Sequence, residues 1–155
     1  SYFHPITRDL VGNISLSGGH IVGLDQDVSV LNRFFLGGDN FRGFASGGVG
    51  PRDAATNDSI GGNVFYVMTG ELRFPIGLPQ DFGVLGRTFA QVGTLSGPDV
   101  SGADLQDAKD PRVSVGIGIS WRSPFGPISV DLAQAVVKEN FDKEEVFRFS
   151  FGTQF

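Results

Sequence analysis

The sequence is poor in the residues that most often build metal and redox sites. Its 155 residues include no cysteine, two histidines and one methionine. The lack of cysteine excludes disulfides and thiol chemistry, and His4 and His20 are too few for a typical zinc site. A formal net charge of −5 argues against a nucleic acid as partner, because phosphate-binding surfaces are rich in Lys and Arg.

Long hydrophobic runs are also absent. No apolar run approaches the roughly 18 residues of a transmembrane helix. The mean hydropathy is close to zero, although 40% of the residues are hydrophobic. A soluble protein would give this average, but membrane-spanning β-strands give it too, because only alternate residues face lipid.

Apolar residues instead recur at every second position, which predicts β-strands with one apolar face and one small, polar face. The clearest alternation places Val113, Val115, Ile117, Ile119 and Trp121 between Ser114, Gly116, Gly118 and Ser120. Six strands and part of a seventh are predicted, over about residues 1–6, 10–24, 63–76, 87–95, 111–122, 127–138 and 146–155.

The lengths of these segments favour a membrane. Globular strands average about five to six residues, whereas membrane-spanning strands need about 9–11, and most segments here are of the longer kind. The predicted turns alternate between short and long, which is the layout of an outer-membrane barrel. A soluble β-sandwich would also alternate, but its outer face would carry more Lys and Glu. We therefore predict an all-β, antiparallel meander in a membrane.

A long loop over residues 25–62 interrupts this pattern. Its centre, residues 34–51, is too rich in glycine for a helix, yet it carries enough phenylalanine to bury apolar groups and be ordered. Arg42 lies in the middle, between Phe41 and the Gly43-Phe44 pair. An arginine held among aromatic residues and glycines needs an anionic or aromatic partner.

No pattern of catalytic residues stands out. The glycine-rich loop lacks the Lys-Ser/Thr pair of a phosphate-binding loop, and no helix follows it. Four acidic residues could suggest calcium, but their spacing lacks the EF-hand pattern, which favours a solvated loop; they are Asp99, Asp104, Asp107 and Asp110. No motif brings Ser, His and Asp together as a triad. We expect no enzyme activity, no metal and no cofactor.

Four stretches, in this order, resemble a known family. They are Gly37-Gly38 with Phe41-Arg42-Gly43-Phe44; Gly61-Gly62-Asn63 leading to Glu71-Leu72-Arg73-Phe74-Pro75; Trp121-Arg122-Ser123-Pro124-Phe125-Gly126-Pro127; and the aromatic terminus ending in Phe155. Together they are similar to the C-terminal part of the BamA-type outer-membrane β-barrel assembly factors, the bacterial surface-antigen barrel family. One departure is Phe41, where the family has valine.

This resemblance implies a transmembrane barrel of about sixteen strands, of which residues 1–155 would form the last six to seven, with the long loop inserted into the lumen. Since bacterial barrels start at about eight strands, we expect a part of a longer protein with two open edges.

The resemblance also implies how the loop is held. Arg42 would pair with Glu71, the family's acidic partner, which lies on the polar face of its strand. The family has an acidic residue at a second position, where this sequence has Gln91. One charged partner and one neutral hydrogen bond are therefore expected for Arg42. Phe41 and Phe44 would stack against the guanidinium or the barrel wall.

The last strand is expected to carry the targeting signal of outer-membrane barrels and one side of a lateral gate. Its apolar face holds Phe147, Phe149, Phe151 and Phe155. Gly152 would permit a kink, which suits a seam that opens.

The function implied is the folding and insertion of other outer-membrane β-barrel proteins through this gate. The implied partners are those client proteins, periplasmic assembly lipoproteins and outer-membrane lipid. Alternatives are a passive pore or secretion barrel, an autotransporter-assembly relative and a mitochondrial sorting barrel. A soluble β-domain that binds a ligand between sheets is a further possibility.

Overall fold

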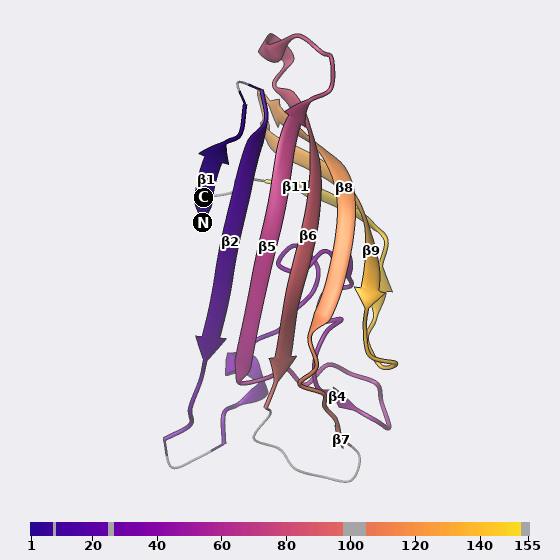
Figure 1. The fold of residues 1–155 in the computed structure, drawn as a ribbon. Coiled ribbons are helices and arrows are strands. Elements are labelled where there is room, and N and C mark those ends of the chain that lie inside the picture. The colour runs from indigo at the N-terminus through magenta and orange to yellow at the C-terminus, as the bar shows by residue number, and fades with distance from the viewer. Residues whose placement is uncertain (8, 25–26, 98–104, 153–155) are drawn as a thin grey trace.

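The computed structural model describes residues 1–7, 9–24, 27–97 and 105–152. Within these ranges, seven strands form one antiparallel sheet in the order β1-β2-β5-β6-β8-β9-β11 (Figure 1). Their bounds are Tyr2–Pro5 for β1, Val11–His20 for β2, Val64–Pro75 for β5, Val84–Ser96 for β6, Arg112–Ser123 for β8, Gly126–Val137 for β9 and Phe147–Phe151 for β11. The predicted all-β antiparallel meander is confirmed.

Neighbouring strands of the sheet pair in a continuous register, except for one shift between β8 and β9. β2 pairs with β5 from Val11↔Arg73 to His20↔Val64. β8 and β9 pair with a register shift between Val113 and Ser114. In the part of the chain that the structure describes, β1 and β11 form the two edges of the sheet.

Short turns gather at one end of the sheet and long loops at the other (Figure 1). The turn between β8 and β9 and the hairpin between β5 and β6, with the short 3-10 helix η2 (Gln80–Phe82), lie at the upper end in this view. The long loop after β2 and the segment between β6 and β8 lie at the lower end. In the described ranges, no helix is long and apolar enough to cross a membrane.

The strand ends differ from the sequence prediction at several places. β6 begins at Val84, three residues before the predicted Arg87, because Val84 pairs with Trp121 of β8. Gly86 reads as part of a turn in the sequence, but it lies in the strand, where a Cβ would come 2.5 Å from the ring of Phe74. β2 ends at His20 instead of residue 24, and β11 ends at Phe151, before Gly152, the last described residue.

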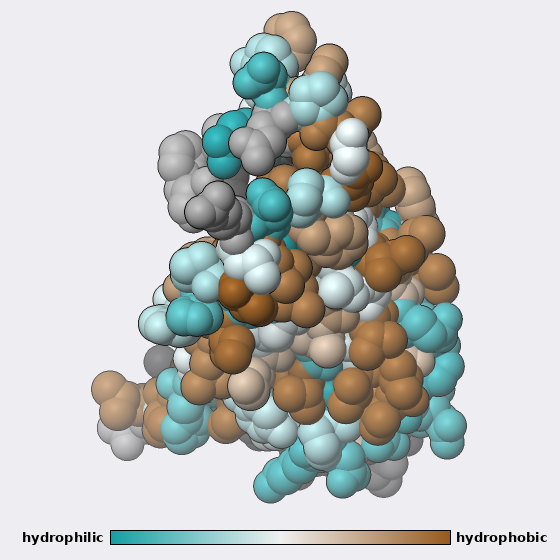
Figure 2. All heavy atoms as spheres, turned by 45° about the horizontal axis from the view of Figure 1, so that its top comes forward, coloured by the Kyte–Doolittle hydropathy of each residue, from teal (hydrophilic) through white to brown (hydrophobic). Residues whose placement is uncertain are grey.

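The two faces of the sheet differ as the alternation predicts. Outward side chains such as Leu16, Met68 and Ile117 are apolar and exposed, the last at 60%. Figure 2 shows hydrophobic residues gathered over this outer face and hydrophilic residues at its lower margin. Exposed apolar patches of this extent mark a surface that another apolar phase covers.

The long loop folds back onto the concave face of the sheet (Figure 1). It contains the 3-10 helix η1 (Val30–Asn32) and two short strands, β3 (Gly43–Phe44) and β4 (Arg52–Asp53). β3 pairs with β10 (Glu144–Glu145), and β4 pairs with β7 (Leu105–Gln106). The loop predicted to be ordered is therefore held by short ladders to the other long segments.

The hydrophobic core lies between this loop and the sheet. Phe41 and Phe44 are fully buried, and their ring centroids are 4.9 Å apart. The remaining buried members come from the loop and from β5, β6 and β9; they are Leu36, Val49, Val67, Leu95 and Ala135. Aromatic burial thus provides much of the free energy that keeps the loop on the sheet.

Phe44→Ala is expected to weaken the attachment of the loop by about 3–5 kcal/mol, the usual cost of removing a buried phenylalanine ring. Limited proteolysis of the loop in the full-length protein measures this change. The control is Phe125→Ala, at an exposed turn residue. Equal cleavage rates in Phe44→Ala and the control would contradict the packing described here.

Candidate functional site

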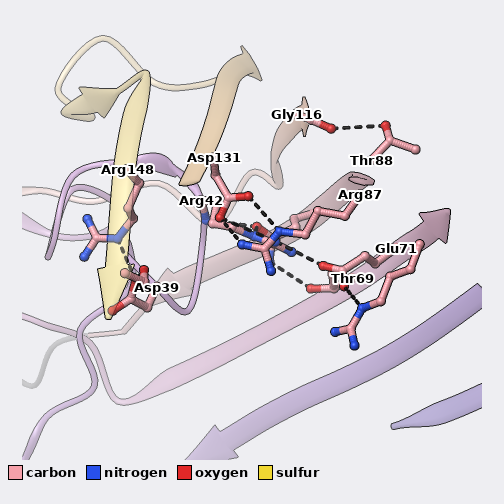
Figure 3. A network of polar contacts seen from close by, with 12 residues as sticks. Asp39, Arg42, Thr69, Glu71, Arg87, Thr88, Gly116, Asp131 and Arg148 are labelled. Carbon is pink, nitrogen blue, oxygen red and sulfur yellow. Dashed lines mark hydrogen bonds and ion pairs between the residues drawn. The ribbon is translucent and has the colours of Figure 1, made fainter. Parts of the chain in front are cut away.

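Arg42 lies where the loop meets the sheet, and its polar groups are directed at β5 and β6. Its Nη1 donates to Oε2 of Glu71 at 3.1 Å. Its Nε and its backbone N–H both donate to Oε1 of Gln91, at 3.2 and 2.9 Å. The structure therefore brings together Arg42, Glu71 and Gln91, which the sequence singled out. Figure 3 shows Arg42 and Glu71 side by side.

Gln91 is itself held in one orientation. Its Nε2 donates to Oγ1 of Thr69 on the neighbouring strand at 2.8 Å. Because one end of the amide is engaged as a donor, its oxygen is presented to Arg42 as an acceptor. A neutral side chain therefore holds both the backbone and the side chain of the loop residue.

An aromatic ring also lies against the guanidinium, and it is Phe89. The Arg42 Cζ is 3.5 Å from the centroid of this ring, within the range of a cation–π contact. Phe41 and Phe44 were expected to stack against the guanidinium or the barrel wall, and both rings pack in the core against the wall. Residues 89 and 91 share one face of β6, because side chains two residues apart in a strand point the same way. The strand alternation could therefore have predicted that Phe89 lies beside Gln91.

A second carboxylate near Arg42 was missed by the sequence analysis. Asp131 of β9 is 2% exposed, and its Oδ2 is 4.0 Å from Nη1 of Arg42. Arg87 of β6 donates through Nε to Oδ1 of Asp131 at 2.8 Å, and its Nη2 contacts Oδ2. In the sequence, Asp131 looks like one more polar position of an alternating strand.

These groups form a line of alternating charges across the concave face (Figure 3). Arg73 donates through Nε to Oε1 of Glu71 at 2.8 Å, so this carboxylate joins Arg73 and Arg42. Asp131 joins Arg87 to the same Arg42. At an effective dielectric constant of about 20, opposite charges about 4 Å apart attract by about 4 kcal/mol before desolvation is subtracted.

The charge of Arg42 makes these partners necessary. Burial lowers the pKa of the Arg42 guanidinium, and the carboxylates of Glu71 and Asp131 act in the opposite direction. Arginine stays protonated in proteins, so the side chain enters this site as a cation. A buried cation without an anionic partner would strongly disfavour the folded loop.

Gly43 lets the loop approach the wall. Its φ is +92°, a conformation that L side chains rarely adopt, and a Cβ would lie 2.9 Å from Cβ of Ser114. Glycine meets both the backbone and the space requirement. In this four-residue stretch, the rings of Phe41 and Phe44 fill the core and Arg42 supplies the buried cation. Gly43 lets the loop backbone lie close to the wall.

The terminal strand has the predicted alternation. Phe147, Phe149 and Phe151 are each more than half exposed on the outer face. Gly152 follows with φ of +151°, and the kink at this residue stays a prediction. Phe155 lies outside the described residues, and the gate role of this strand stays a prediction.

The acidic loop that was considered for calcium is only partly described, since Asp99 and Asp104 lie outside the described residues. Asp107 accepts a hydrogen bond from the backbone N–H of Gly97 at 3.3 Å. Among the residues that the structure describes, no three acidic or histidine side chains are grouped as metal ligands.

The fold and the site define a class of membrane β-protein. Its antiparallel sheet has an apolar, exposed outer face, and a loop is anchored on the inner face by an arginine. Residues 1–155 match the Omp85 superfamily domain. The chain belongs to this superfamily.

Similar proteins agree with this assignment. The outer membrane protein assembly factor BamA of Neorickettsia risticii is 40% identical over 149 residues, which are 96% of this chain and 20% of the relative. The outer envelope protein 80, chloroplastic, of Arabidopsis thaliana is 33% identical over 145 residues, 89% of this chain and 16% of the relative. The chain thus spans a fifth or less of the length of these curated relatives.

A solved structure shares the fold. The crystal structure of BamA from Haemophilus ducreyi lacking POTRA domains 1–3 has a TM-score of 0.75 at 27% identity, covering 95% of this chain and 32% of the other. The predicted location, an integral β-structure of the outer membrane, is confirmed by this likeness and by the BamA relative of Neorickettsia risticii. The Neorickettsia risticii relative is named an assembly factor, which agrees with the expectation of no enzyme activity.

Arg42→Ala in the full-length protein is expected to weaken loop attachment by about 2–3 kcal/mol, because it removes hydrogen bonds to a charged partner. Arg42→Lys should give an intermediate loss, since lysine keeps the charge but lacks the planar fork. Protease sensitivity of the loop measures both. Arg122→Ala, at an exposed arginine of β8, is the control, and a loop no more sensitive in Arg42→Ala than in this control would refute the anchor.

Proposed function

We propose that residues 1–155 are the C-terminal part of the transmembrane barrel of an outer-membrane protein assembly factor. The full-length protein would fold β-barrel clients and insert them into the outer membrane through a lateral gate beside β11. The proposal includes periplasmic assembly lipoproteins as partners, on the family resemblance alone. It includes outer-membrane lipid as the phase that covers the exposed apolar face.

The observation that carries the proposal is the loop anchored on the inner wall. Arg42 is bonded to Glu71 and Gln91 and covered by Phe89. A passive pore needs an open lumen and does not require a loop held to its wall by a buried cation. The anchored loop therefore favours assembly over passive conduction, the leading alternative.

A client strand would be received by an open strand edge. β11 pairs with β9 through five residue pairs, from Phe147↔Leu132 to Phe151↔Ile128, and it is an edge of the described sheet. An edge strand offers unpaired N–H and C=O groups to an incoming strand. Within the proposal, the client pairs with this edge while its outward side chains enter lipid.

This mechanism predicts where a client can be trapped. A cysteine replacing Phe149 in the full-length protein, and one in the terminal strand of a client barrel, should give a disulfide-linked adduct during assembly. Cross-strand neighbours lie about 4.5–5.5 Å apart, close enough for a disulfide. Separation of membrane proteins without reducing agent measures the adduct.

Ile117→Cys is the matched control. Ile117 is 60% exposed and Phe149 is 58% exposed, both on the outer face. Ile117, however, lies on β8, which is paired on both sides, with β6 and β9. Equal adducts at the two positions, or none at Phe149 while the client inserts normally, would count against the gate.

A further inference from the structure

Arg148 of β11 reaches from the terminal strand into the long loop. Its Nε donates to Oδ1 of Asp39 at 2.7 Å, and its Nη2 lies 3.5 Å from Oγ of Ser46. Its Nη1 donates to Oε2 of Glu145 at 2.6 Å. All three nitrogens of the guanidinium are engaged, and two of the partners belong to the loop (Figure 3 shows the contact with Asp39).

Asp39 receives a second donor from the same strand. Oγ of Ser150 donates to Oδ1 of Asp39 at 2.8 Å. Arg148 and Ser150 are two residues apart, so both project from the inner face of β11. The hydrogen bonds from Arg148 and from Ser150 lower the pKa of Asp39 below its ordinary value, so its carboxylate is charged at neutral pH.

Gly38 makes room for this contact. Its φ is +71°, and a Cβ would lie 2.8 Å from Nη2 of Arg148 and 2.7 Å from Oγ of Ser46. A larger residue would displace the guanidinium from the loop. The turn before Arg42 is therefore shaped to admit a side chain from the terminal strand.

β11 has few other supports among the described residues. It is paired along one edge only, with β9, over five residue pairs, whereas β6 is paired on both sides. A contact on the inner face of β11 therefore contributes more to the local stability of this strand than the same contact would on an interior strand.

We propose that Asp39 and Arg148 are positioning residues that couple the place of the long loop to the order of the terminal strand β11. The gate role of β11 rests on the proposed function, but the coupling itself does not. Asp39 and Arg148 lie 109 residues apart in the sequence. Their contact adds a side-chain link to the β3–β10 ladder, which joins the loop to Glu144–Glu145 just before β11. When the loop leaves the wall, β11 loses this support.

The test is amide hydrogen exchange of residues 147–151 in the full-length protein in lipid bilayers. Asp39→Asn should accelerate exchange by about two- to fivefold, the range that corresponds to a partly exposed ion pair. Asp58→Asn is the matched control, because it removes the same charge from an exposed site of the same loop. Gly38→Ala should give an effect in the same direction by displacing the guanidinium.

A double-substitution comparison isolates the pair. In an Arg148→Gln background, Asp39→Asn should add little further acceleration, because its main partner is already gone. Equal acceleration in both backgrounds, or no difference between Asp39→Asn and Asp58→Asn, would overturn the coupling. Client insertion is measured in parallel: faster exchange with unchanged insertion would support the coupling and count against the gate instead.

Discussion

The buried cation of Arg42 is the constraint on which the loop and the inner wall both depend. A charged guanidinium leaves water only where carboxylates and acceptors are already in place. Glu71 of β5, Gln91 of β6 and Asp131 of β9 supply them from three strands. The position of the loop is therefore tied to the register of the sheet, and a shift of one residue would turn these groups to the outer face.

The two faces of the sheet have different surroundings. The alternation of apolar and polar residues along each strand directs one kind of side chain to each face. Outward residues such as Ile117 and Phe149 are apolar and exposed, as a lipid-covered face requires. The inner face carries charges that a lipid phase would reject. The loop then covers part of this inner face with its own aromatic core of Phe41 and Phe44, so one sheet supports a polar network and a small hydrophobic core.

The sequence predicted the site in outline and missed part of its chemistry. The family resemblance placed Arg42, Glu71 and Gln91 together, and Arg42 is hydrogen-bonded to both of the others. Phe89 and Asp131 were not singled out, because each fits an ordinary strand alternation. The stacking ring was sought in the loop, next to Arg42 in sequence, but it lies on the wall.

By itself, the sequence determined the strands, their faces and the presence of a long loop with an arginine at its centre. These are local properties, since the period of two follows from the pleat of a single strand. Only the tertiary structure decided that Phe89 and Asp131 also surround Arg42 and that Asp39 meets Arg148. Those contacts depend on the register of several strands and on how the sheet curves, which no local pattern contains.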